Sequence, residues 1–196
     1  MRRGSFIFAL LCALVGTSVL SAPTALAARS ATGPLAPPQP TEWTVVLGGG
    51  TPTSAARSLY FIANGRYTSA ELAYTGDNHA MLRARATVVG PWERFMLRWD
   101  PRTVSYVLQS LQTGRYVSTE LGYAGDKYAM LRARATAIGP SERYALFQNR
   151  RTGRYALWSK ANLRFVSTEL GYAGGSKGML RAGATAIGPQ EQFLFA

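Results

Sequence analysis

Short stretches of the chain alternate hydrophobic and polar residues with a period of two. The stretch 130–138, MLRARATAI, is the clearest of them. Its apolar positions are Leu131, Ala133 and Ala135, and its polar positions are Arg132, Arg134 and Thr136. Successive side chains of a strand point to opposite faces of a sheet, so this pattern predicts a strand with one buried face.

Four strand-like segments follow one another between residues 103 and 152. β-branched and aromatic residues at 104–110 and 115–120 flank a turn signal at Gly114, which predicts a hairpin. A glycine-containing loop at 121–129 precedes the alternating strand, and a Gly-Pro turn leads into a fourth strand at 143–149. No part of this unit has the hydrophobic spacing of a helix.

This unit occurs three times. The sequences ELAYTGDNHAMLRARATVVGP, ELGYAGDKYAMLRARATAIGP and ELGYAGGSKGMLRAGATAIGP begin at Glu71, Glu120 and Glu169, so matched positions recur every 49 residues. Twelve strands in three equivalent units predict an all-β fold, the β-trefoil, in which each unit buries its apolar face only against its neighbours. The predicted shared core consists of Leu82, Leu131, Leu180, Val89, Ile138, Ile187, Phe95, Tyr144 and Phe193.

The N-terminal residues differ from the repeats in composition. Two arginines, an apolar run at 6–20 and small residues at 25–27 predict a signal peptide at 1–27, hence a secreted, extracellular protein without a membrane span after cleavage. Phe6 lies one place late for a twin-arginine signal, which favours the general secretion route. The only cysteine, Cys12, lies in the apolar run, so the mature chain is expected to contain no disulfide.

A proline-rich segment at 28–41 predicts a linker, and residues 42–196 are the size of one domain. Two interpretations of Trp43 and the TVVL segment remain open, an extra strand that seals the barrel or a part of the linker.

The chain is strongly basic. Its formal net charge is +12, and loss of Arg2 and Arg3 with the signal peptide leaves about +10. This charge favours acidic partners such as anionic wall polymers or sulfated glycans, although a GC-rich genome also enriches arginine. The sequence contains no Lys/Arg block and no nucleic-acid-binding motif, which argues against nucleic acid as the partner.

Three further motifs carry a resemblance to a known family. GRYTSAE, GRYVSTE and LRFVSTE are each followed by an LRARAT-type strand and then by GPWERF, GPSERY or GPQEQF. Over 56–196 the chain resembles the fascin-like β-trefoil domains of the actin-crosslinking superfamily, an architecture that also serves sugar binding and protease inhibition. Leu163 replaces a turn glycine, and Ser141 and Gln190 replace Trp92, so we expect the third hairpin and the last two corners to differ locally.

Catalysis finds little support in the sequence. His79 is the only histidine, and no His/Cys/Asp cluster has metal-ligand spacing, so we expect no enzyme, no metal and no cofactor. Paired glutamates could act as acid and base. We expect them instead to bind turn amides or to pair with arginines; they are Glu71, Glu93, Glu120, Glu142, Glu169 and Glu191.

The loop that follows the second strand of each repeat holds the first candidate binding residues. They are Tyr74, Asp77, Tyr123, Asp126, Tyr128 and Tyr172, with Gly175 at the third aspartate position. An exposed aromatic ring stacks on the apolar face of a sugar, and a carboxylate accepts hydrogen bonds from its hydroxyls. The alternative is that the tyrosines cover the barrel core and direct their hydroxyls to backbone groups.

The arginines of the alternating strands are the second candidate. Arg85 and Arg134, with Arg83, Arg132 and Arg181, could form a cationic ring that binds an anionic polymer, although Gly183 interrupts it. Pairing with the recurring glutamates is the alternative and would neutralise the ring.

The leading hypothesis is a secreted, non-enzymatic protein that binds a polysaccharide of a cell wall or extracellular matrix through three weak sites acting together. Three alternatives remain. The first is a protein partner, either an actin-like filament or a protease held by the insertion at 48–58. The second is salt-sensitive binding to anionic polymers, and the third is a hydrolase that uses Glu71 or Glu93.

Overall fold

The computed structural model describes residues 41–48 and 56–196. The predicted signal peptide, the predicted linker up to residue 40 and residues 49–55 of the insertion lie outside the described residues. Within the described part of the chain, no helix is long and apolar enough to cross a membrane.

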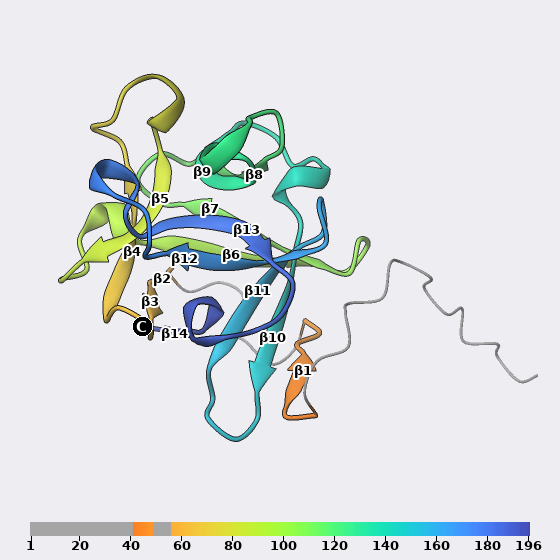
Figure 1. Cartoon of the computed structure of the whole chain (residues 1–196). Helices are drawn as coiled ribbons and strands as arrows, with labels where there is room; N and C mark the ends of the chain where they lie inside the picture. The colour runs from red at the N-terminus through yellow and green to blue at the C-terminus, as the bar shows by residue number, and fades with distance from the viewer. Residues whose placement is uncertain (1–40, 49–55) are drawn as a thin grey trace, which may run out of the picture. The chain divides into compact units, whose positions relative to one another are not determined.

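The described residues form one sheet of 14 strands (Figure 1). The other regular elements are six 3-10 turns of three residues, η1 to η6. The strands are β1 (Trp43–Val45), β2 (Ala56–Arg57), β3 (Leu59–Phe61), β4 (Arg66–Glu71), β5 (Met81–Ala86), β6 (Phe95–Asp100), β7 (Ser105–Ser110), β8 (Tyr116–Glu120), β9 (Met130–Ala135), β10 (Tyr144–Asn149), β11 (Tyr155–Ser159), β12 (Arg164–Glu169), β13 (Met179–Ala184) and β14 (Phe193–Phe195). The all-β prediction is confirmed.

Pairings between neighbouring strands close a barrel. β3 pairs with β14, β14 with β11, β11 with β10, β10 with β7, β7 with β6, and β6 with β2. β2 and β3 are separated only by Ser58 and occupy the place that the continuous β7 takes 49 residues later, so they act as one interrupted strand. Twelve trefoil positions are therefore filled, and the predicted β-trefoil is confirmed.

Three hairpins, β4–β5, β8–β9 and β12–β13, surround one axis at one end of the barrel. Each contains a register shift at the matched position. The second strands of the hairpins pair with one another through Met81↔Arg132, Arg181↔Met130 and Met179↔Arg83. This triangle of pairings brings the loops 72–80, 121–129 and 170–178 together, although they are 49 residues apart in sequence.

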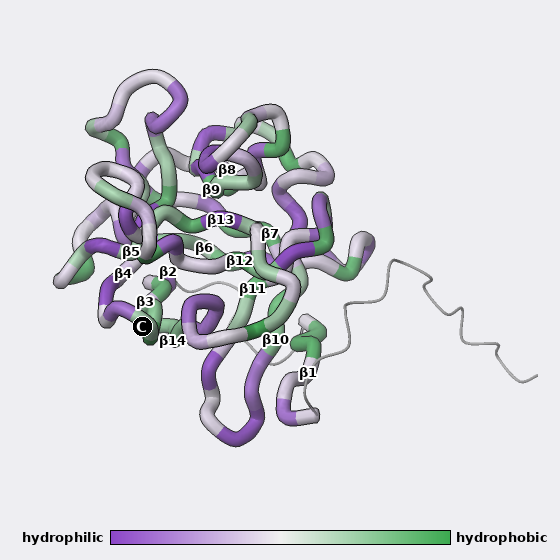
Figure 2. The backbone as a smooth tube through the Cα atoms, in the orientation of Figure 1, coloured by the Kyte–Doolittle hydropathy of each residue, from purple (hydrophilic) through white to green (hydrophobic). Residues whose placement is uncertain are grey.

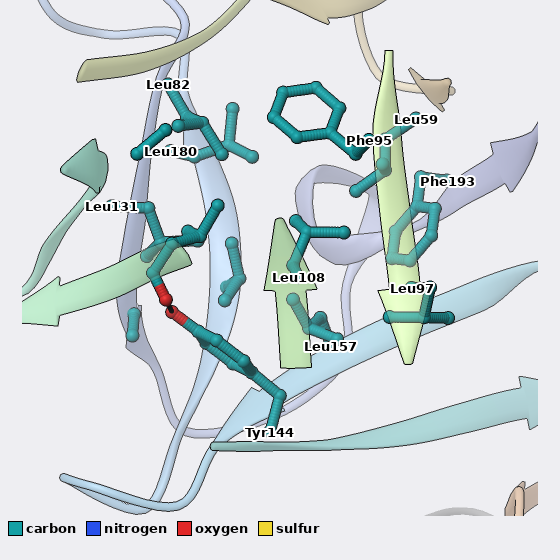
Figure 3. Packing of buried hydrophobic residues seen from close by; sticks show 14 of the residues in the cluster. Leu59, Leu82, Phe95, Leu97, Leu108, Leu131, Tyr144, Leu157, Leu180 and Phe193 are labelled. Atoms are coloured by element: carbon teal, nitrogen blue, oxygen red, sulfur yellow. Dashed lines mark hydrogen bonds between the residues drawn. The ribbon is translucent and has the colours of Figure 1, made fainter. Parts of the chain in front are cut away.

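The buried core agrees with the prediction at two of its three layers. Leu82, Leu131 and Leu180 are at most 1% exposed and gather in one part of the cluster, and the residues at the matched aromatic position are buried as well (Figure 3). The third predicted layer is wrong for two of its three residues, since Val89 is 37% and Ile138 is 40% exposed, whereas Ile187 is half-buried against a separate hydrophobic cluster. The strands end before these positions, so the side chains lie on the turn that leads to the next corner.

The third hairpin keeps the geometry of the first two, contrary to expectation. Leu163 has a φ of 61°, close to the 63° of Gly65 and the 67° of Gly114. Its amide donates to the carbonyl of Ser159 at 3.0 Å, as the glycines do to their own partners. Closure of the surrounding barrel therefore holds a leucine in the left-handed region that favours glycine.

The corners are also alike, because a carboxylate and not a tryptophan holds each of them. The amides of Gly90, Gly139 and Gly188 donate to Glu93, Glu142 and Glu191 at 2.8, 2.6 and 2.6 Å. These glutamates are at most 8% exposed. The predicted role of the corner glutamates as acceptors of turn amides is confirmed.

The segment after the linker adds an extra strand at the edge of β10. β1 pairs antiparallel with β10 through Trp43↔Asn149, Thr44↔Gln148 and Val45↔Phe147. The indole of Trp43 is 8% exposed and packs in a small cluster with Phe147, Trp158 and Phe165. Of the two open interpretations, the extra strand is therefore correct. The connection from β10 to β11 is strongly hydrophilic (Figure 2).

Candidate binding face

The three loops 72–80, 121–129 and 170–178, here called the axial loop face, rest on a cluster of methionines. Met81, Met130 and Met179 are at most 1% exposed and pack against one another. Tyr74, Tyr123 and Tyr172 are half-buried and pack on this cluster. The tyrosine rings therefore have one face on apolar side chains, so they cover the end of the barrel.

Two arginines bind the loops to one another. Arg83 donates through Nε and Nη2 to the carbonyl of Lys177 at 2.9 and 2.7 Å and through Nη1 to the hydroxyl of Tyr74. Its guanidinium carbon lies 5.9 Å from the centroid of the Tyr74 ring. Arg83 thus joins the tyrosine of the first loop to the backbone of the third.

Arg132 makes the equivalent contacts in the second repeat. It donates to the carbonyls of His79 and Gly76 at 2.9 and 3.3 Å and to the Tyr123 hydroxyl at 2.6 Å. The side chain was predicted to lie on the polar face of its strand, but Arg132 is only 5% exposed. The loops bury it because their carbonyls satisfy the guanidinium.

The two aspartates of the sequence prediction lie at the contacts between loops. Asp77 is exposed and pairs with Lys127 of the next loop at 3.2 Å. Burial raises the pKa of the Tyr172 hydroxyl, and the nearby Asp126 carboxylate adds to the rise. Tyr128 is 43% exposed and occupies the position of His79 and Lys177 in the other loops. Tyr128 is thus the predicted aromatic with the most accessible ring.

Arg85 and Arg134 lie farther from the axis, each on a buried glutamate. Arg134 donates twice to Glu120, at 2.6 and 2.6 Å, and Arg85 contacts both oxygens of Glu71. The hydrogen bond to its carboxylate raises the pKa of each arginine. Internal pairing is confirmed for both, and their side chains are still 45% and 51% exposed.

The third repeat breaks this arrangement. Gly183 stands where the first two repeats have Arg85 and Arg134. Glu169 therefore lacks the partner that Glu71 and Glu120 have, and Arg181 takes that place by donating through Nε to Glu169 at 3.0 Å. A Cβ at position 183 would lie 3.1 Å from the Arg181 guanidinium carbon, so the arginine occupies space that only glycine leaves open.

A cleft of about 460 Å³ opens beside the axial loop face, between the first hairpin and the third loop. We call it the first cleft; its lining includes Asn64, Arg66, Arg83, Arg85, Leu170 and Lys177. Sequence reasoning missed Asn64, Arg66 and Lys177. An arginine after the hairpin turn recurs as Arg115 and Arg164, and this recurrence is the signal that could have drawn attention to the position.

The recurring glutamates are engaged in structural contacts. Each of the six recurring glutamates accepts from an arginine or from a turn amide. Across residues 41–48 and 56–196, no group of three His, Cys, Asp or Glu side chains could hold a metal ion. The site offers cations, a few aromatic rings and amide groups for binding.

Comparison with protein families finds no match, and comparison with curated proteins finds none either. Solved structures match over most of the chain. The designed threefold-symmetric protein ThreeFoil has a TM-score of 0.59 at 16% identity, over 72% of this chain and 97% of that protein. The ricin B-like lectin of Macrolepiota procera, solved with lactose, has a TM-score of 0.57 at 13% identity, over 74% and 96%. The Rhizoctonia solani agglutinin has a TM-score of 0.56 at 13% identity, over 74% and 98%. These similarities show the β-trefoil fold.

Proposed function

We propose that the protein is a secreted, non-enzymatic β-trefoil that binds glycans. The observation that carries this proposal is the first cleft, an open concavity where guanidinium, ammonium and amide groups converge beside the apolar side chain of Leu170. A few convergent polar groups on a partly apolar concave surface are typical of small-ligand and saccharide sites. Proteins of the same fold support it, since the Macrolepiota procera lectin was solved with lactose.

The threefold scaffold favours a repetitive ligand. The loops of the axial loop face are held by the same barrel and by side-chain contacts to one another, so sites on them keep a fixed spacing. Weak sites on a rigid support gain strongly in avidity when a polymer engages more than one of them. The proposed ligand is therefore a polysaccharide of a cell wall or an extracellular matrix.

Two finer parts of the proposal come from the sequence. Export rests on the arginines, the apolar run and the small residues within 1–27. Membership of the fascin-like group among the trefoils rests on the repeated GRY and GP-x-E motifs. Fold alone does not assign function, so an actin filament enters the test below as a competing ligand.

The test is binding of the purified full-length product, collected from the culture medium, to an array of neutral and acidic polysaccharides that includes filamentous actin. We expect retention on at least one polysaccharide, no release of soluble sugar, and weaker retention for the Arg66→Ala variant, whose side chain lines the first cleft. Arg66 is exposed, so we expect the variant to keep the fold, which a matched melting temperature would verify. Binding to actin alone, or to nothing on the array, would refute the proposal.

A further inference from the structure

Threefold symmetry makes the clefts beside the loops comparable residue by residue, and their charges differ. In the first cleft four cations, Arg66, Arg83, Arg85 and Lys177, accompany one carboxylate, Glu71. The matched positions in the second repeat are Arg115, Arg132, Arg134 and His79 with Glu120. In the third they are Arg164, Arg181, Gly183 and Tyr128 with Glu169. Positive charge therefore decreases from the first position to the third.

Contacts between repeats show that these positions are equivalent in space. Arg83 donates to the backbone carbonyl of Lys177 at 2.9 Å, and Arg132 donates to that of His79 at the same distance. The loop residue at this position thus lies next to the hairpin of the following repeat in both cases. The difference in charge comes from side chains on a common backbone frame.

The cations of the first cleft keep most of their charge available. Arg66 and Lys177 are exposed, and neither has a carboxylate within salt-bridge distance among the described residues. Arg83 donates to carbonyls and a hydroxyl, which are neutral acceptors and leave its charge uncompensated. Only Arg85 is paired, with the buried Glu71, and even its side chain is 45% exposed. An excess of positive charge in a concave site attracts anions.

From these observations we infer that the first cleft binds an anionic substituent, a carboxylate, sulfate or phosphate group, of an acidic polysaccharide. This inference rests on the proposed glycan-binding function and names its ligand class. Arg66 presents a planar guanidinium that can hold an oxyanion with two parallel hydrogen bonds, and Lys177, which also lines the cleft, adds an ammonium at the end of a flexible side chain. The sugar ring beside the anionic group meets Leu170 and Asn64, which line the same cleft.

The charge gradient also predicts a stoichiometry. The first cleft holds two more cations than the third position, where a glycine and an exposed tyrosine replace an arginine and a lysine. An acidic oligosaccharide too short to reach a second site therefore binds with high affinity at one site per chain. The sequence repeats suggest three equal sites, but the side chains make the sites unequal.

The experiment is isothermal titration calorimetry of the full chain with short oligosaccharides of matched length. The probes are a carboxylated oligogalacturonate, a sulfated heparin fragment, a phosphate-containing teichoic-acid fragment and a neutral chitooligosaccharide. We expect one tight site for at least one acidic probe, with affinity that falls as salt rises. The double variant Arg66→Gln, Lys177→Gln should lose about tenfold or more in affinity, since it removes two charged contacts.

The third repeat supplies the matched control. Arg164→Gln removes an exposed arginine at the position equivalent to Arg66, and should change affinity for the acidic probe less than about twofold. A loss in Arg164→Gln as large, per charge removed, as that of the double variant would mean that net charge alone drives binding, and would overturn the inference. Duplex DNA that competed as well as the acidic oligosaccharide would overturn it too. Binding of the neutral probe alone would remove this inference and leave the proposed function standing, whereas binding of no saccharide would remove both.

Discussion

The broken third repeat can be repaired by one substitution, Gly183→Arg, and the structure predicts the consequence. Position 183 matches that of Arg85, which reaches Glu71, so we expect the new arginine to reach Glu169 in the same way. Its Cβ would come within 3.1 Å of the Arg181 guanidinium, which must therefore shift, and the new side chain competes with it for the carboxylate. The guanidinium is the free end of a flexible side chain, so it can move without disturbing the backbone. We expect Arg181 to take the position that Arg132 has, between the second loop and Tyr172.

The expected gain follows from two contributions. Replacing a glycine inside a strand removes about 0.5–1 kcal/mol of unfavourable backbone entropy. The new pair resembles that of Arg134 and Glu120 and is worth up to about 1 kcal/mol with solvent screening included, but it replaces the existing pair of Arg181 and Glu169, so the exchange of partners adds little. The free energy of unfolding should therefore rise by about 0.5–1 kcal/mol. For a domain of this size the melting temperature should rise by about 1–4 °C.

Thermal and urea denaturation of both proteins measure this difference, and Gly183→Ala separates the two contributions. The alanine also crowds Arg181 but gives Glu169 no new partner, so Gly183→Arg should be the more stable by up to about 1 kcal/mol. Adding Glu169→Gln should abolish that advantage. If the arginine variant were no more stable than the alanine variant, pairing with Glu169 would add nothing to the free energy of unfolding. A crystal structure with Arg181 still on Glu169 would refute the proposed exchange directly.

Two further predictions concern acid stability and backbone strain. Hydrogen bonds from the Thr103 hydroxyl and then from Arg143 lower the pKa of Asp100 from 3.8 to about 2, so its stabilising contribution is present above pH 3.8 and is lost as pH falls towards 2. Asp100→Asn should therefore flatten the decline of urea midpoints over that range; an unchanged decline would contradict this. Leu163→Gly should raise the free energy of unfolding by about 0.5–1 kcal/mol, and Gly114→Leu should lower it by about 1 kcal/mol; opposite signs in equilibrium denaturation would contradict the strain.

The features that were predicted correctly depend on patterns that can be read directly along the sequence. Alternation over 130–138 predicted the strand, and recurrence every 49 residues predicted the trefoil, since a unit that cannot bury its own apolar face must close against copies of itself. The corner glutamates were also predictable, because Glu142 lies only three residues after Gly139, whose amide donates a hydrogen bond to its carboxylate. Leu163 shows the limit of this reasoning. Its residue type argued against the turn, but the closed barrel outweighs about 1 kcal/mol of local strain.

The binding surface depended on contacts that sequence patterns do not specify. Arg83 meets Lys177 across 94 positions, and it does so only because the barrel closes and brings the first hairpin beside the third loop. A period of two places every arginine of a strand on the same face, but it does not say which one finds a carboxylate, which one bonds a loop and which one stays free. The sequence alone therefore determined the repeats, the strands and most of the core. Only the tertiary structure decided the partners of the arginines, because partner choice depends on distances between residues far apart in the chain.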